Sequence, residues 1–198
     1  MNVSFNCFGK IHYGVDLSHH NVVVNWKKVD ASFIYLKASE GSTIKDSKFD
    51  NFVIQAQKHK ILVGAYHFMT TSSSAKKQFE NFSKIVDKHN MDLIPVLDIE
   101  RQTKGYKLST SKLRKEVRIF VNLCKKHYKT APIIYCSQAF YTKYFLGYFD
   151  DCMYWCGDVN YPALLPHVIH QKYIKKVPGI KGKVDYNILN CKLKEICL

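Results

Sequence analysis

Two acidic side chains, two positions apart, are the first chemically suggestive feature of this sequence. Asp98 and Glu100 lie at the end of the apolar segment Leu93–Glu100. On a β-strand such residues point to the same side, with Cα atoms about 6.5–7 Å apart. Carboxyl groups this close raise the pKa of at least one of them by mutual repulsion, and burial raises it further. One protonated and one ionised carboxyl group are what hydrolysis of a glycosidic bond requires.

Two further acids end other apolar segments, although the chain has only 16 Asp and Glu among 198 residues. Asp16 follows Gly14-Val15, and Asp185 follows Lys183-Val184. If these segments are parallel strands of a barrel, their carboxyl ends converge on one face. We therefore predict that the catalytic residues are Asp16, Asp98, Glu100 and Asp185. The alternative, acids that merely bond nearby lysines or backbone amides, stays open at this point.

Aromatic and polar side chains end several of the same segments. Tyr66, His67, Tyr135, Trp155 and Gln171 are placed there. Sugars are bound by aromatic faces against their C–H surfaces, with amides and hydroxyls on the ring hydroxyl groups. These residues are candidates for sugar binding, and the competing interpretation is a barrel core with polar edges.

Other chemistries have weaker support. His19 and His20 are adjacent, so on a strand they point to opposite faces and do not form a metal site. No glycine-rich phosphate loop is present. The seven cysteines include no CxxC pair, although Cys152/Cys156 and Cys191/Cys197 are close enough in sequence to permit bridges. We expect no metal and no cofactor, a buried Cys136, and synthesis in a reducing compartment.

Short apolar segments alternate with amphipathic stretches along the chain. The predicted strands are Ile11–Asp16, Ser32–Lys37, Leu62–Phe68, Leu93–Glu100, Pro132–Cys136, Met153–Cys156, His167–Gln171 and Lys183–Asn187. The predicted helices are Asp46–His59, Ser73–His89, Ser109–His127 and Ser137–Phe145. This alternation favours a parallel sheet. A regular eight-helix barrel needs about 250 residues. We therefore predict an α/β fold, an irregular TIM-like (β/α) barrel of eight strands with fewer than eight helices. It forms a single domain over residues 1–198, with a core at roughly 11–190.

The composition limits the classes of molecule that the protein is expected to bind. Hydrophobic residues make up 46% of the chain, and the formal net charge is +14. Such a charge attracts polyanions, but the lysines are scattered and no nucleic-acid-binding motif appears. No apolar run has the ~20 residues of a membrane span, and the amino terminus does not resemble a signal peptide.

Several motifs together resemble a known family. Eight segments resemble, in order, motifs of the family 25 glycoside hydrolases, the Chalaropsis-type lysozymes. They are Gly14-Val15-Asp16-Leu17-Ser18-His19, Phe33 to Gly41 (FIYLKASEG), Gly64-Ala65-Tyr66-His67-Phe68, Val96-Leu97-Asp98-Ile99-Glu100, Ile134-Tyr135, Trp155, Gln171 and Val184-Asp185-Tyr186-Asn187. The matches span residues 14 to 187.

The resemblance implies an N-acetylmuramidase that cleaves the β-1,4 bond between N-acetylmuramic acid and N-acetylglucosamine in peptidoglycan. It implies that Glu100 is the general acid. Asp98 would orient and polarise the reacting centre or stabilise a substrate N-acetyl group acting as nucleophile. Asp16 and Asp185 would complete an acidic floor. The sugar-binding residues would be Tyr66, His67, Tyr135, Trp155, Gln171 and Lys37, with Lys37 and Glu40 behind the sugar contacts or at the rim of the site. The sequence departs from the family at His20, where Trp is frequent, and at Lys172 after Gln171.

The expected partners follow from this resemblance. They are peptidoglycan and, through the net charge, anionic cell-wall polymers, with no nucleic acid and no membrane span. We expect a monomer that acts extracellularly, released as phage lysins are or after loss of a leader. A phage lysin, an autolysin and a digestive enzyme remain alternatives. A barrel that binds glycans without cleaving them and, less favoured, a basic nucleic-acid-binding protein also remain.

Overall fold

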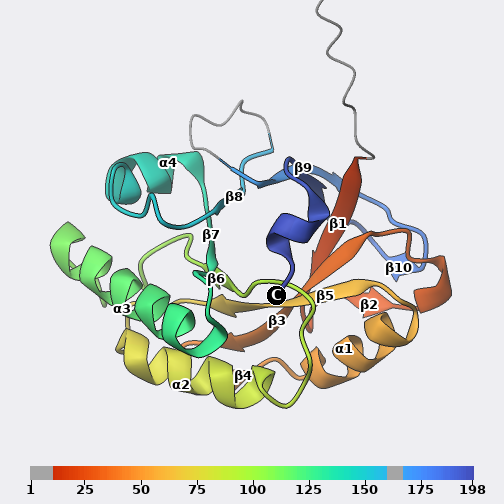
Figure 1. Ribbon diagram of the computed structural model, residues 1–198, viewed down its shortest axis with the longest axis horizontal. Helices are drawn as coiled ribbons and strands as arrows, with labels where there is room; N and C mark the ends of the chain where they lie inside the picture. The colour runs from red at the N-terminus through yellow and green to blue at the C-terminus, as the bar shows by residue number, and fades with distance from the viewer. Residues whose placement is uncertain (1–10, 160–166) are drawn as a thin grey trace, which may run out of the picture.

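The computed structural model describes residues 11–159 and 167–198, and its centre is a closed barrel of strands (Figure 1). The barrel strands are β1 (His12–Leu17), β3 (Phe33–Glu40), β5 (Leu62–Phe68), β6 (Val96–Asp98), β7 (Ile133–Cys136), β8 (Tyr154–Cys156), β9 (Ile169–Lys175) and β11 (Val184–Leu189). Pairing runs in this order, and β11 closes the ring by pairing with both β9 and β1. The predicted eight-stranded barrel is confirmed.

The direction of β11 departs from the predicted parallel sheet. Neighbouring strands from β1 to β9 are parallel, whereas β11 is antiparallel to β9 and to β1. Only residues 176–183 join β9 to β11, and they include the short strand β10 (Ile180–Lys181), which pairs with β2 (Val22–Val23). A parallel crossover needs a dozen or more residues. The short connection therefore turns the chain back.

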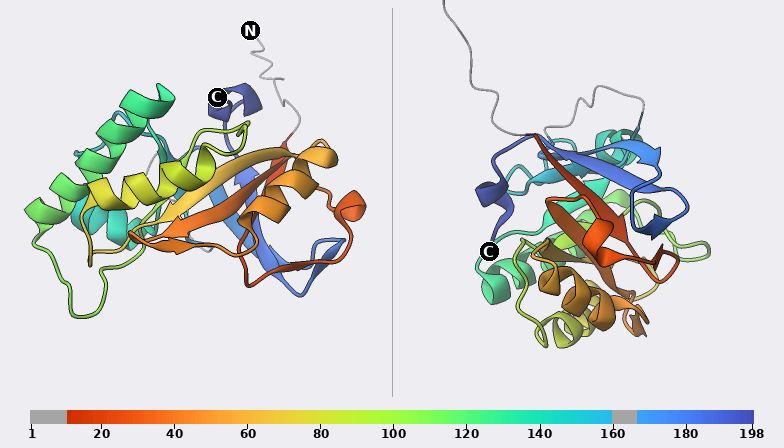
Figure 2. Two further views of the ribbon diagram at one scale, coloured as in Figure 1. Left: turned by 90° about the horizontal axis from the view of Figure 1, so that it is seen from below. Right: turned by 90° about the vertical axis from the view of Figure 1, so that its right-hand side faces the viewer.

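Helices cover the outer side of the barrel along strands β3 to β7 (Figures 1 and 2). They are α1 (Phe49–Lys58), α2 (Ala75–Val86), α3 (Thr110–Tyr128) and α4 (Gln138–Phe140), which continues into a π-helical turn (Tyr141–Phe145). The remaining elements are β4 (Ile44–Lys45) and the 3-10 turns Trp26–Lys28 and Leu193–Ile196. Among these described elements, none is a helix with the length and apolar character needed to span a membrane.

Side-chain alternation along the strands creates two cores. On β3, Phe33 and Tyr35 point into the barrel, and Ile34 and Leu36 pack under the helices. The inner rings need space, and glycines on the neighbouring strands supply it. A Cβ at Gly14 would lie 2.2 Å from the Phe33 ring, and a Cβ at Gly64 would lie 2.2 Å from the Tyr35 ring.

The carboxyl-terminal segment fills the amino end of the barrel. Ile196 is fully buried in the inner core, and its carbonyl accepts a hydrogen bond of 2.9 Å from the Ile94 N–H. Leu93 forms an isolated bridge with Cys197. These contacts explain why β6 is shorter than the predicted strand, since Leu93 and Ile94 pair with the chain terminus instead.

The cysteines in the described part of the chain are free thiols. Cys136 is fully buried, as predicted. Neither of the two bridges that the sequence spacing permitted is formed. Cys7 lies outside the described residues.

Candidate active site

A cavity of about 330 Å³ opens at the carboxyl end of the barrel. This volume lies in the range of small-molecule sites. The lining residues are Asp16, Leu17, Ser18, His20, Asn21, Lys37, Tyr66, Phe68, Val96, Asp98, Glu100, Tyr135, Trp155, Lys183, Val184 and Asp185. The structure thus brings together all four predicted acids and most of the predicted sugar-binding residues.

Asp98 and Glu100 occupy contrasting environments. Asp98 ends β6 and is 8% exposed, while Glu100 is exposed. The extended backbone continues past β6 because the Ile99 N–H donates to the Tyr135 carbonyl at 3.0 Å, which sends both acids to the cavity side. Burial raises the pKa of Asp98 well above its ordinary value, and the charges of Glu100 and Asp16 raise it further. Burial also raises the pKa of Glu100, against a lowering by Arg101.

Asp98 also lacks one protein partner. Its Oδ1 atom is buried and has no hydrogen bond to any described residue. Asp98 lines the cavity, and when it is protonated its carboxyl group is a hydrogen-bond donor there. A carboxyl group that stays protonated inside a site provides a hydrogen bond that an ionised one cannot.

Asp16 and Asp185 face the same cavity from neighbouring strands. Asp16 is held by the Asn187 side chain, whose Nδ2 donates to Oδ2 at 2.8 Å. Burial, followed by the charge of Asp185, raises the pKa of Asp16 to about 7. Burial raises the pKa of Asp185 as well, against a hydrogen bond from Gln171 that lowers it. Asp185 reaches this face because β11 is antiparallel, so its amino end lies where the other strands end.

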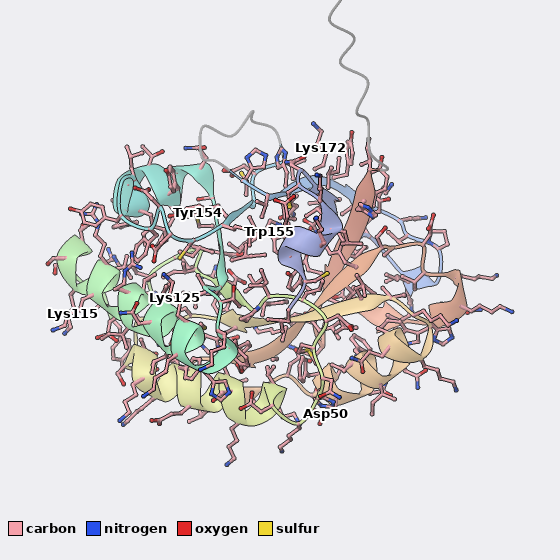
Figure 3. All side chains as sticks on the ribbon, in the orientation of Figure 1. Asp50, Lys115, Lys125, Tyr154, Trp155 and Lys172 are labelled. Atoms are coloured by element: carbon pink, nitrogen blue, oxygen red, sulfur yellow. The ribbon has the colours of Figure 1, made fainter. Side chains whose placement is uncertain are left out.

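An aromatic wall lies beside the acids. Tyr135 and Trp155 meet edge to face with ring centroids 5.3 Å apart. Trp155 points into the barrel from β8, while the preceding Tyr154 lies outside it and packs on Tyr141 (Figure 3). Burial raises the pKa of Tyr66 well above its ordinary value, so its hydroxyl is neutral in the cavity. This wall suits the apolar face of a sugar ring.

Lys37 lines the cavity as predicted, but its charge is engaged. Its Nζ donates to Oε2 of Glu40 at 2.6 Å and lies 4.9 Å from the centroid of the Phe68 ring. Lys37 lowers the pKa of both Asp98 and Glu100, though less than their burial raises it. Gln171 lies just behind the lining, where its Oε1 accepts a 3.0 Å hydrogen bond from the Tyr135 hydroxyl.

The prediction that His67 contacts a sugar is wrong. His67 is fully buried outside the barrel, where its ring stacks on Phe120 with centroids 5.2 Å apart. Its Nδ1 lies 2.8 Å from Ser39 Oγ and its Nε2 lies 3.1 Å from Gln78 Oε1. Alternation along β5 explains this position, because the neighbouring Tyr66 and Phe68 take the two cavity-facing positions.

Several site residues were absent from the predicted set. Asn187 is fully buried and joins two members of the site, since its Oδ1 accepts from Trp155 Nε1 at 3.1 Å. Phe68, Lys183 and His20 line the cavity. The same-face spacing of Lys183, Asp185 and Asn187 on one strand was the available signal.

Within the described part of the chain, no group of three or more histidine, cysteine, aspartate and glutamate side chains is arranged to hold a metal ion. His19 does not line the cavity, and its Nδ1 lies 2.7 Å from Asp46 Oδ2.

Comparison with known proteins agrees with this geometry. A bacterial lysozyme from Streptomyces coelicolor has a similar structure, with a TM-score of 0.85, 27% identity, and coverage of 93% of this chain and 94% of that one. A family 25 glycosyl hydrolase from Bacillus anthracis has a TM-score of 0.83, 26% identity, and coverage of 93% and 91%. Lysozyme M1 of Streptomyces globisporus is 29% identical over 197 residues, which cover 89% of this chain and 67% of the relative. The family model described as "Glycosyl hydrolases family 25" matches residues 15–169, and the chain therefore belongs to that family.

Proposed function

We propose that this protein is a lysozyme, an N-acetylmuramidase that hydrolyses the β-1,4 bond between N-acetylmuramic acid and N-acetylglucosamine in peptidoglycan. The observation that carries the proposal is the Asp98–Glu100 pair, a buried acid beside an exposed one in a single cavity. The lysozyme relatives and the family membership support it.

The roles follow from the environments. Glu100, whose pKa is raised by burial, protonates the leaving glycosidic oxygen as the C–O bond breaks. Water supplies the hydroxyl group to the anomeric carbon, and its proton restores Glu100. Asp98, which lines the cavity with Glu100, orients the reacting sugar. Asp16 and Asp185 place negative charge where positive charge develops in the transition state.

Substrate binding uses the aromatic wall. Trp155, Tyr135 and Tyr66 offer ring faces and edges to the sugar. The Tyr135 hydroxyl is fixed by Gln171, so its remaining lone pair has a defined direction. Lys37 contributes a cation at the rim beside Glu40.

Digestion of purified peptidoglycan tests the activity. Mass analysis of the released fragments should show muramic acid at the new reducing ends, whereas glucosamine there would contradict the proposed specificity. Glu100→Gln should abolish release while retaining binding to the insoluble substrate. A protein that only binds glycans would release nothing in either form, and its binding would not change.

We also propose that the protein acts extracellularly and binds anionic cell-wall polymers through one edge of the barrel. This basic edge carries five exposed lysines on β9, β10 and the segments that flank β10: Lys172, Lys175, Lys176, Lys181 and Lys183. No ion pair joins any of them to a described acidic residue within 4.0 Å. Lys183 also lines the cavity, so the basic edge is continuous with the site.

Salt and charge variants test this partner. Binding to whole cell walls should weaken several-fold between low and physiological salt, because screening shortens the range of charge attraction. The triple variant Lys172→Gln, Lys176→Gln, Lys181→Gln should lose most of this salt-sensitive binding. A matched variant on α3, with Lys112, Lys115 and Lys126 changed to Gln, should keep it, since Lys115 lies far from Lys172 (Figure 3). Equal binding by both variants at every salt concentration would reject the basic edge as the contact.

A further inference from the structure

Two buried amide side chains connect the aromatic wall to Asp16 and Asp185. Asn187 accepts from Trp155 Nε1 at 3.1 Å and donates to Asp16 Oδ2 at 2.8 Å. Gln171 accepts from the Tyr135 hydroxyl at 3.0 Å, and its amide group lowers the pKa of Asp185. The site thus contains two parallel chains of the form aromatic donor, amide, carboxylate.

The two amides are themselves neighbours. Asn187 on β11 and Gln171 on β9 are directly paired across the antiparallel ladder, beside a register shift at Tyr186/Asn187. Asn187 is fully buried and Gln171 is 7% exposed. Neither is free to reorient toward water, so each amide has a fixed set of partners.

The hydrogen-bond donors determine how each amide is turned. An indole N–H only donates, so the atom of Asn187 that meets Trp155 must be Oδ1, and the atom that meets Asp16 must be Nδ2. Asp16 Oδ2 is therefore an acceptor. Any proton on Asp16 resides on Oδ1. For Gln171, acceptance from Tyr135 likewise leaves its NH₂ group for Asp185.

We infer that Asn187 and Gln171 are positioning residues that favour the ionised forms of Asp16 and Asp185, because each amide directs its NH₂ group at one of these carboxylates. Without these donors, two carboxyl groups this close in a buried site favour a state in which one of them keeps its proton. The consequence for catalysis rests on the proposed function, in which both carboxylates face developing positive charge. The protonation claim itself does not.

Other groups around Asp16 act on the same equilibrium. The titratable or charged groups that line the cavity with Asp16 are Asp185 on β11, Asp98 and Glu100 at the end of β6, Tyr66 on β5, Tyr135 on β7, Lys37 on β3, and Lys183 and His20 outside these strands. Asp185 and Glu100 raise the pKa of Asp16, and the bond from Asn187 lowers it. Removing the Asn187 donor must therefore move the titration of Asp16 upward.

The test is the titration of Asp16 itself, followed by NMR on protein labelled with ¹³C at the aspartate carboxyl carbons and assigned with Asp16→Asn. The substitution Asn187→Asp keeps the acceptor for Trp155 and removes the donor to Asp16. It should raise the Asp16 midpoint from about 7 by at least ~1 pH unit. Gln171→Glu should raise the Asp185 midpoint in the same way. The acid limb of the pH–rate profile should move upward with the midpoint, so that at a pH well below both midpoints the variant is about tenfold slower than wild type.

Controls separate positioning from packing. Trp155→Phe keeps the Asn187–Asp16 bond and should shift the Asp16 midpoint by less than half as much. If Asn187→Asp does not fold, Asn187→Leu fills the same space without a donor and should raise the midpoint too. Midpoints unchanged in folded Asn187 and Gln171 variants would overturn the inference. The NMR titration needs no substrate, so an inactive wild-type protein with the expected shifts would refute only the proposed function.

Discussion

Asp16 and Asp185 meet in the cavity from strands that run in opposite directions. Asp16 lies near the carboxyl end of β1, and Asp185 lies near the amino end of β11. Continuing the register that pairs Val15 with Tyr186 places the two acids opposite each other. Cross-strand partners have Cβ atoms only about 5 Å apart. Bringing two carboxyl groups together in a buried place costs stability, and that cost is measurable.

Asp16→Asn should make the protein more stable above pH 7. The pKa of Asp16 is about 7 in the folded protein and 3.8 ordinarily, so between these two pH values the folded state binds more protons than the unfolded state. Stability from this group is therefore present below about pH 4 and is lost as pH rises toward 7. Asn cannot ionise and still accepts from Asn187. We expect a gain of a few kcal/mol at pH 8, of the order that such a shift implies, and little gain at pH 4. Urea unfolding at both pH values measures it.

Asp151→Asn is the control with the opposite sign. Asp151 pairs with Arg118 Nη1 at 2.6 Å and with Lys125, and these contacts lower its pKa below the ordinary range. Stability from this acid is present at neutral pH and is lost on acidification. The variant should be less stable than wild type at pH 8. Equal stability of Asp16→Asn and wild type at pH 8 would contradict the idea that the acidic pair strains the fold.

His67→Phe should lower stability without removing a substrate contact. Gln78 Oε1 accepts from the Thr70 N–H at 2.9 Å, so His67 Nε2 is the donor in its hydrogen bond to the same oxygen. Burial lowers the pKa of His67 to about 4. Phe keeps the stack on Phe120 but leaves the polar groups of Ser39 and Gln78 without this partner. We expect a loss of about 1–3 kcal/mol at pH 7.

Two measurements on His67→Phe check this assignment. Unfolding experiments should show that the wild type loses the stability contributed by neutral His67 as pH falls from 6.5 toward 4, and that the variant does not. Peptidoglycan hydrolysis per folded molecule, measured well below the melting temperature, should fall less than it does in Tyr66→Phe. A larger loss of hydrolysis in His67→Phe than in Tyr66→Phe would mean that His67 does contribute to substrate binding.

Gly64→Ala should be strongly destabilising. The added Cβ would lie 2.2 Å from the Tyr35 ring and 3.0 Å from Leu93 Cβ. Tyr35 cannot yield, because it is fully buried and its hydroxyl donates to the Ile94 carbonyl at 3.1 Å. Overpacking of this kind costs about 1–3 kcal/mol or more. The double variant Gly64→Ala, Tyr35→Leu should recover part of the loss, and thermal unfolding of both proteins measures it.

The positions of site residues could be predicted from the sequence wherever they depend only on the alternation of side chains along a strand. Leu62–Phe68 is β5 to the residue, and Asp98 and Glu100 share one side as the i, i+2 rule requires. The same rule, applied strictly, also excludes His67 from the cavity. Asp185 was assigned to the correct face for an incomplete reason, because the direction of β11 depends on a connection too short for a crossover.

The hydrogen bonds of the buried amide side chains could not be predicted from the sequence alone. The partners of Asn187 are 32 residues away at Trp155 and 171 residues away at Asp16. Only barrel closure brings them together. The shortening of β6 has the same origin, since Ile94 pairs with Ile196 near the end of the chain. Local patterns predict which side a residue faces, whereas contacts across the closed ring depend on register.

Arg101→Gln should shift the alkaline limb of activity toward higher pH. Arg101 is exposed and is the largest influence that lowers the pKa of Glu100, opposing the burial that raises it. Without this cation, Glu100 retains its proton to higher pH and continues to act as a general acid there. Solvent and salt screen an exposed charge, so we expect a shift of a few tenths of a pH unit that shrinks as ionic strength rises. Lys104→Gln removes an equal charge from the same loop, and Lys104 is not among the groups that shift Glu100. Its pH–rate profile should match wild type, whereas an identical shift in both variants would mean that net charge, not Arg101, tunes the acid.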